Sequence, residues 1–311
     1  MSKKQVEERR QQARRRLAQR WIAAGAALVA LVLAGAWWAA QSTALGGGTA
    51  SGGTPISRLS TGDFHSLAFS PVDPETVFFG HHGGLMVSHD GGRTWQVTTL
   101  PNADAMALAA PAADPQIFYA AGHGVLYRSR DGGATWESLI ANLPGSDIHG
   151  FAADPANAQV VFAHVVGSGI WGSQDGGETW ASISASAPPS TFNLAVGETA
   201  QTLFATAGQA GLWRSDDGGA TWAAISVLPG DGAVAVVFDP GSRKLYATTA
   251  GDEAGLYASE DSGSTWNPLA LKGVLLALAV SSLDSNHVLV VDEAGRVYAS
   301  RDGGATWSGE N

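Results

Sequence analysis

The octet SRDGGATW occupies Ser129–Trp136 and recurs unchanged at Ser300–Trp307. Four further octets share its pattern S-x-D-x-G-x-T-W: SHDGGRTW (Ser88–Trp95), SQDGGETW (Ser173–Trp180), SDDGGATW (Ser215–Trp222) and SEDSGSTW (Ser259–Trp266). Their aspartates stand 41, 44, 42, 44 and 41 residues apart, at Asp90, Asp131, Asp175, Asp217, Asp261 and Asp302. A nearly constant period of this length indicates a repeat architecture.

Each repeat contains four short runs with the composition of β-strands. In the first repeat these runs are His65–Ser70, Thr76–Gly80, Leu85–Ser88 and Thr94–Leu100. Four strands in about 40–45 residues make one blade of a β-propeller. The sequence therefore predicts an all-β fold, a six-bladed propeller over residues 55–311. We expect residues 56–60 to complete the sixth blade, because only four residues follow the last octet.

The octet itself has a structural explanation. It lies between the third and fourth strands of each blade, where an aspartate accepts hydrogen bonds from turn amides. The glycines allow backbone angles that other residues resist, and the tryptophan packs against the blade. We therefore interpret all six octet aspartates as structural residues.

The N-terminal part has a different organisation. Residues 1–20 hold eight Lys/Arg and two Glu, a net charge of +6, and we interpret them as a cytoplasmic tail. Residues 21–40 are uncharged and long enough for a transmembrane helix, while the Gly/Ser-rich residues 41–54 are typical of a linker. The positive-inside rule then predicts a single-pass protein of the cytoplasmic membrane, in contact with lipid, with the propeller outside. A cleaved signal peptide and a secreted propeller are the alternative.

The octets resemble the Asp-box, or bacterial neuraminidase (BNR), repeat. This repeat occurs in sialidases, in sortilin-like receptor domains, in the photosystem II assembly factor family and in bacterial proteins labelled sialidase-like glycosyl hydrolases. The resemblance covers residues 55–311 and implies a propeller, but it does not fix an activity. Sialidases use three arginines, a Tyr–Glu pair and an Asp. That set is not recoverable here, because Ile56–Leu59 reads ISRL rather than the sialidase motif.

Composition excludes several classes of function. The chain has no Cys, so it has neither disulfides nor thiolate metal sites. Residues 21–311 carry 10 Lys/Arg against 26 Asp/Glu, a net charge of −16, which disfavours nucleic acid as a partner. We assign no cofactor and no metal from the sequence.

Most histidines fall in loops on the face of the propeller opposite the octets. His65 and His149 begin first strands, and His82, His123 and His164 lie between second and third strands. Blades 5 and 6 place carboxylates at the corresponding loops: Asp252, Glu253, Asp292 and Glu293. These nine residues are the candidate ligand-binding set. Imidazoles also suit transition metals, and paired carboxylates suit glycoside cleavage. Ordinary solvated loop residues are the remaining interpretation.

These observations favour a membrane-anchored, extracytoplasmic propeller that acts as a non-catalytic binding or scaffold module for a glycan or protein ligand. Two alternatives stay open. One is a glycoside hydrolase that acts on cell-wall or environmental glycan, which is the only enzyme class that we consider. The other is an assembly factor for a membrane protein complex.

Overall fold

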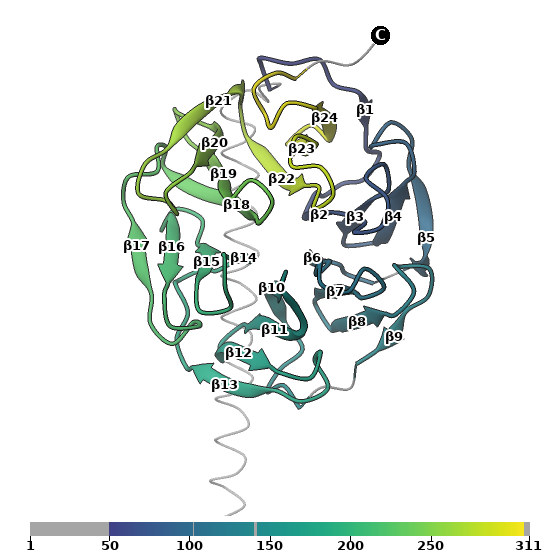
Figure 1. Ribbon diagram of the computed structural model, residues 1–311, viewed down its shortest axis with the longest axis vertical. Coiled ribbons are helices and arrows are strands. Elements are labelled where there is room, and N and C mark those ends of the chain that lie inside the picture. Colours follow the sequence, from purple (N-terminus) through teal and green to yellow (C-terminus); the bar gives the residue numbers. More distant parts are fainter. Residues whose placement is uncertain (1–49, 102, 140–141, 308–311) are drawn as a thin grey trace, which may run out of the picture. The chain divides into compact units, whose positions relative to one another are not determined.

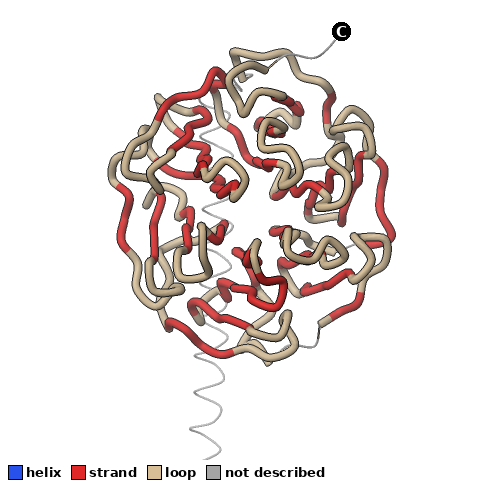
Figure 2. Tube along the Cα trace, viewed as in Figure 1, coloured by secondary structure: helices blue, strands red, loops and turns tan. Residues whose placement is uncertain are grey.

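The computed structural model describes residues 50–307, apart from 102, 140 and 141. These residues form six four-stranded antiparallel sheets that follow one another around a ring (Figure 1). Strands and loops make up the whole of this part, as Figure 2 shows, and none of its segments is a helix long and apolar enough to cross a membrane. The predicted tail and transmembrane helix, residues 1–40, lie outside the described residues.

The first three blades are continuous in sequence, and each runs from an innermost to an outermost strand. Blade 1 consists of β2 (Ser66–Phe69), β3 (Val77–His81), β4 (Gly84–Ser88) and β5 (Gln96–Pro101). Blade 2 consists of β6 (Ala107–Ala109), β7 (Phe118–Gly122), β8 (Val125–Ser129) and β9 (Glu137–Ser138). Blade 3 consists of β10 (Ile148–Asp154), β11 (Asn157–Val165), β12 (Gly169–Ser173) and β13 (Ala181–Ser184).

The last blade is completed by the start of the propeller. Blade 4 consists of β14 (Asn193–Val196), β15 (Leu203–Thr206), β16 (Leu212–Ser215) and β17 (Ala223–Ile225). Blade 5 consists of β18 (Gly232–Asp239), β19 (Lys244–Ala250), β20 (Gly255–Ser259) and β21 (Asn267–Lys272). Blade 6 consists of β22 (Leu275–Val280), β23 (Val288–Asp292), β24 (Arg296–Ser300) and β1 (Ser57–Arg58). Pairing of β1 with β24 confirms the predicted ring closure and covers an edge that sheets otherwise leave exposed.

The Asp-box turns are closed by their own side chains. In blade 3, Asp175 Oδ1 accepts from the Thr179 amide at 2.8 Å and Asp175 Oδ2 accepts from the Thr179 hydroxyl at 2.6 Å. Ser173 Oγ donates to Asp175 Oδ1 and accepts from the Gly177 amide. These bonds lower the pKa of Asp175 to about 2, with the Thr179 hydroxyl as the main cause. The box aspartate is thus a structural acceptor.

The box tryptophans do more than pack. The indole N–H of Trp180 donates to the Gly177 carbonyl at 3.0 Å, and Trp307 makes the same bond to Gly304. Both side chains are buried, whereas Trp136 and Trp266 are half-buried. The box tryptophans, which the sequence predicts to pack against each blade, are therefore buried to different extents in different blades.

The linker expected over residues 41–54 is shorter than predicted. Ser51 and Lys272 exchange two backbone hydrogen bonds of 2.8 and 2.9 Å, and the Thr54 amide donates to the Trp307 carbonyl. Ala50 is buried against blades 5 and 6. Gly/Ser-rich composition therefore concealed a segment that is bonded to the propeller from residue 50 onward.

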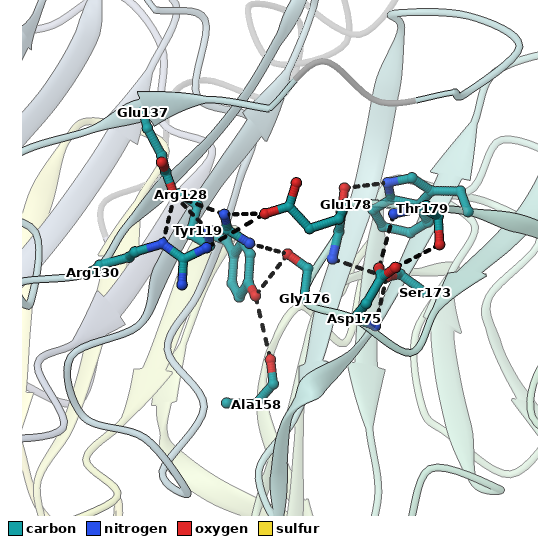
Figure 3. A network of polar contacts seen from close by, with 12 residues as sticks. Tyr119, Arg128, Arg130, Glu137, Ala158, Ser173, Asp175, Gly176, Glu178 and Thr179 are labelled. Atoms are coloured by element: carbon teal, nitrogen blue, oxygen red, sulfur yellow. Dashed lines mark hydrogen bonds and ion pairs between the residues drawn. The ribbon is translucent and has the colours of Figure 1, made fainter.

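Polar contacts join neighbouring blades. Arg128 in β8 is 3% exposed and donates from Nη1 to the Gly176 carbonyl in the box of blade 3, at 2.9 Å (Figure 3). The hydroxyl of Tyr119 reaches the same carbonyl at 3.1 Å. Glu137 and Glu178 flank the guanidinium, and their hydrogen bonds raise its pKa against the effect of burial. An arginine of one blade thus fixes the box of the next.

Candidate functional site: the face opposite the Asp boxes

Antiparallel pairing divides the loops between two faces. Within a blade, the loop between the first and second strands and the box turn lie on one face. The loop between the second and third strands and the entry to the first strand lie on the other. His65, His82, His123 and His149 all belong to this second face, at the positions predicted for them. The structure also brings them into contact, which the sequence left open.

Backbone bonds between neighbouring blades bring the loops together. The Ala105 amide, at the entry to blade 2, donates to the His81 carbonyl of blade 1. The Gly124 amide of blade 2 donates to the Ser146 carbonyl at the entry to blade 3, and His123 bridges Asp147. In blades 1 and 2 the loop between the second and third strands therefore lies against the entry segment of the following blade.

A first group of three side chains lies on blade 1. Asp63 Oδ2 is 3.1 Å from His65 Nε2 and 2.9 Å from His82 Nδ1, and the two ring nitrogens are 3.2 Å apart. The His82 amide also donates to Asp63 Oδ2 at 2.6 Å, which fixes the carboxylate. The three ligand-type atoms form a triangle whose sides are nearly equal.

A second group with the same shape joins blades 2 and 3. His123 Nε2 is 3.0 Å from His149 Nε2 and 3.4 Å from Asp147 Oδ1. His149 Nε2 is 3.1 Å from the same oxygen. This group repeats the two-imidazole, one-carboxylate composition of the first.

Asp104 lies between the two groups. Its Oδ2 is 2.6 Å from His123 Nδ1, and its Oδ1 is 3.8 Å from His82 Nε2. The rings of His82 and His123 stack with centroids 6.0 Å apart. We refer to the seven residues together as the His–Asp rim: Asp63, His65, His82, Asp104, His123, Asp147 and His149.

The three aspartates of the rim were missed in the sequence. They precede the box aspartates Asp90, Asp131 and Asp175 by 27, 27 and 28 residues. That spacing, and the Asp-x-His pattern at residues 63–65 and 147–149, was a signal in the repeat alignment. It was overlooked because an aspartate in a short loop is ordinary turn chemistry.

The remaining predicted residues are not part of the rim. His164 is 9% exposed and lies within β11, not in the loop between the second and third strands where the sequence placed it. Asp252 and Glu253 are exposed in the β19–β20 loop of blade 5, across the ring from blade 2. Glu293 is half-buried at the corresponding loop of blade 6.

Asp292 has a structural environment. It is fully buried, and its Oδ1 accepts from the amides of Ala294 and Arg296 at 2.9 and 2.8 Å. Its Oδ2 accepts from the Tyr298 hydroxyl. These bonds close the β23–β24 loop and leave the carboxylate turned away from solvent.

Burial keeps several of the imidazoles neutral. It lowers the pKa of His65 to about 4, with repulsion from His82 as the next cause. Burial also lowers the pKa of His149, against the opposing effect of Asp147. At neutral pH these two rings therefore carry lone pairs rather than positive charge, beside the carboxylates of Asp63 and Asp147.

The central channel offers little chemistry below the rim. It is lined by the six innermost strands, mainly through small apolar side chains such as Ala68, Ala109, Ala195 and Ala279. His65 is the rim residue that also lines the channel. The concentration of polar chemistry on this face is therefore at the loops of blades 1 to 3.

Two family models match parts of the chain. The model described as photosynthesis system II assembly factor YCF48 matches residues 60–199, and the model described as sortilin, neurotensin receptor 3, matches residues 210–309. No curated protein is significantly similar to the chain.

Three solved structures share the propeller fold. A GH74 xyloglucanase from Xanthomonas campestris is 18% identical with a TM-score of 0.55, over 82% of this chain and 55% of the enzyme. A GH74 enzyme from Niastella koreensis is 18% identical with a TM-score of 0.59, over 83% and 46%. The chain thus spans about half the length of these enzymes. A structure of YCF48 bound to a D1 peptide is 19% identical with a TM-score of 0.52, over 84% of both chains.

Proposed function

We propose that this chain, a β-propeller of the Asp-box (BNR) repeat family, is a membrane-anchored binding module whose ligand contacts the face opposite the boxes. The observation that carries the proposal is the convergence of seven aspartate and histidine side chains from three successive blades. Such residues are usually dispersed and solvated when they serve only solubility. Here they are assembled on loops held by a rigid scaffold, where binding residues are commonly found.

The anchor and the location outside the cytoplasm are part of the same proposal. They rest on the uncharged residues 21–40 and the basic residues 1–20 before them. The anchor would hold the propeller close to the membrane, so that a ligand on another membrane protein is within reach.

A protein segment is the ligand that we favour. The YCF48 model matches residues 60–199, which contain all seven residues of the His–Asp rim. The solved YCF48 structure is bound to a peptide and has a length similar to this chain. These likenesses support the more specific form of the proposal, an assembly factor for a membrane protein complex.

Site-specific photocrosslinking in native membranes tests the proposal. Phe192 is 44% exposed beside the rim and stacks on His149, whereas Leu283 is 51% exposed in the β22–β23 loop on the box face. We expect a photoreactive amino acid at Phe192 to give a discrete protein adduct, and the same group at Leu283 to give none. Adducts of equal yield at both positions, or none at Phe192, would contradict the proposal.

The glycoside hydrolase alternative has its own test. Chromogenic glycosides and xyloglucan, incubated with the purified protein, are expected to remain uncleaved. Turnover that is abolished by Asp104→Asn and retained in the box variant Asp217→Asn would replace the binding proposal with an enzymatic one.

A further inference from the structure

We propose that the His–Asp rim holds two divalent transition-metal ions, one between Asp63, His65 and His82 and the other between His123, Asp147 and His149. The inference deepens the proposed function. It rests on that function only in that the ions and the proposed ligand share one face of the propeller. The Asp boxes and the Arg128 contact between blades 2 and 3 are formed by other residues.

The distances within each group fit one ion. A metal bound at about 2.0–2.1 Å with angles of roughly 90–110° separates its ligand atoms by about 2.8–3.4 Å. The three separations are 2.9, 3.1 and 3.2 Å in the first group and 3.0, 3.1 and 3.4 Å in the second. In a linear chain of hydrogen bonds the two end atoms would lie far apart. Here each atom is close to both others.

The third group, formed by His82, Asp104 and His123, does not fit an ion. Its contacts instead indicate how the histidines of the other two groups are oriented. Its contacts are 2.6 Å, from His123 Nδ1 to Asp104 Oδ2, and 3.8 Å, from His82 Nε2 to Asp104 Oδ1. A neutral imidazole has one N–H and one lone pair. The short contact places the N–H of His123 on Nδ1, so that its lone pair at Nε2 faces Asp147 and His149.

Asp104 therefore serves as the partner of both metal-binding imidazoles. A carboxylate that accepts the outer N–H of a ligating histidine orients the ring and makes it a stronger ligand. When His82 binds an ion through Nδ1, its Nε2–H points toward Asp104 Oδ1. Within the described residues that oxygen is buried without a hydrogen-bond partner.

The ligand types define the class of metal. Two imidazoles and one carboxylate suit Zn²⁺, Fe²⁺, Cu²⁺ or Ni²⁺, whereas Mg²⁺ and Ca²⁺ prefer oxygen ligands alone. Neither group contains a Cys or a Met, the soft sulfur ligands that select Cu⁺. Three protein ligands leave at least one coordination position of each ion open to a water molecule or to a group from a binding partner.

Metal titration of the purified, tag-free, full-length protein tests the inference. After chelator treatment we expect two equivalents of Zn²⁺ by calorimetry, and two equivalents of Co²⁺ by visible absorption. His65→Ala and Asp147→Asn should each remove one equivalent, and Asp104→Asn should weaken both sites by roughly 10–100-fold. His89→Ala, which changes an exposed histidine on the box face, should retain two equivalents.

The outcomes separate this inference from the proposed function. Absence of binding at about 100 µM metal, or binding that persists in the His65→Ala/Asp147→Asn double variant, would overturn the metal sites. Thermal unfolding of each variant verifies that it is folded. Photocrosslinking at Phe192 reads the partner rather than the ion, so either proposal can fail while the other stands.

Discussion

His123 Nε2 and His149 Nε2 lie 3.0 Å apart, although one residue belongs to the β7–β8 loop and the other to β10 of the next blade. The contact depends on the backbone bridge between His123 and Asp147 and on the bulge between Ile148 and Gly150. It joins blades 2 and 3 on the face opposite the Asp boxes and brings residues of two repeats into one site.

Removal of a buried box tryptophan should destabilise the propeller strongly. We expect Trp180→Ala to lower the free energy of unfolding by about 3–5 kcal/mol, because a buried aromatic leaves a cavity and its indole hydrogen bond is lost. Trp266→Ala should cost less, since that side chain is half-buried and its Nε1 has no partner among the described residues. Urea unfolding measures both, and equal losses would contradict the difference in packing depth.

The contact between blades 2 and 3 provides a second test of stability. Arg128→Met should cost about 1–3 kcal/mol, because the Gly176 carbonyl then keeps only the Tyr119 hydroxyl as donor and the charge-assisted bonds of Arg128 are lost. Arg130 contacts the same two carboxylates but its side chain is 56% exposed, so Arg130→Met should change stability by less than about 0.5 kcal/mol. The denaturant midpoints of the two variants measure this difference. Similar midpoints would show that the buried Arg128 does not stabilise the contact between blades 2 and 3.

Stability should fall as the pH is lowered from about 6.5 to 4. Burial, aided by His149 and Arg301 respectively, lowers the pKa of His164 and of His287 to about 4, against 6.5 for an unperturbed histidine. Between these values the unfolded chain binds more protons than the folded one, so the free energy of unfolding decreases with falling pH. The full loss per group, reached below pH 4, is at most about 3 kcal/mol.

The pH dependence is measured by thermal unfolding from pH 7.5 to 4. His287→Gln should flatten the curve, since it removes one of the histidines whose pKa is lowered to about 4. Below pH 4 we expect a further loss as the box aspartates protonate; hydrogen bonds from Thr179 and Thr221 hold the pKa of Asp175 and of Asp217 at about 2. A melting temperature that is constant between pH 7 and 5 would contradict the assignment.

The topology of the chain is tested with C-terminal fusions. Alkaline phosphatase fused after Asn311 should be active, since it functions outside the cytoplasm, and replacing the eight Lys/Arg of residues 1–20 by Gln should reduce that activity. A fusion that is active only with a cytoplasmic reporter would contradict the predicted orientation.

The repeat spacing was sufficient to predict the fold and the face on which His65, His82, His123 and His149 lie. Strand boundaries followed to within one or two residues in blade 1, because the box turn fixes the register. The convergence of the His–Asp rim side chains could not be predicted from the sequence, because it depends on the conformation of each loop relative to the next blade. The role of Asp292 was also beyond it: an aspartate in a loop gives no indication that its oxygens are bonded to Ala294, Arg296 and Tyr298.

The most direct test of the central claim, that three blades build one ligand-binding rim, is anomalous diffraction from crystals of the protein grown with Zn²⁺. Two anomalous peaks are expected, each within about 2.0–2.2 Å of the ligand atoms of one group. One peak should lie among Asp63, His65 and His82, and the other among His123, Asp147 and His149. Peaks confined to the box aspartates, or rim histidines that do not converge, would contradict the account.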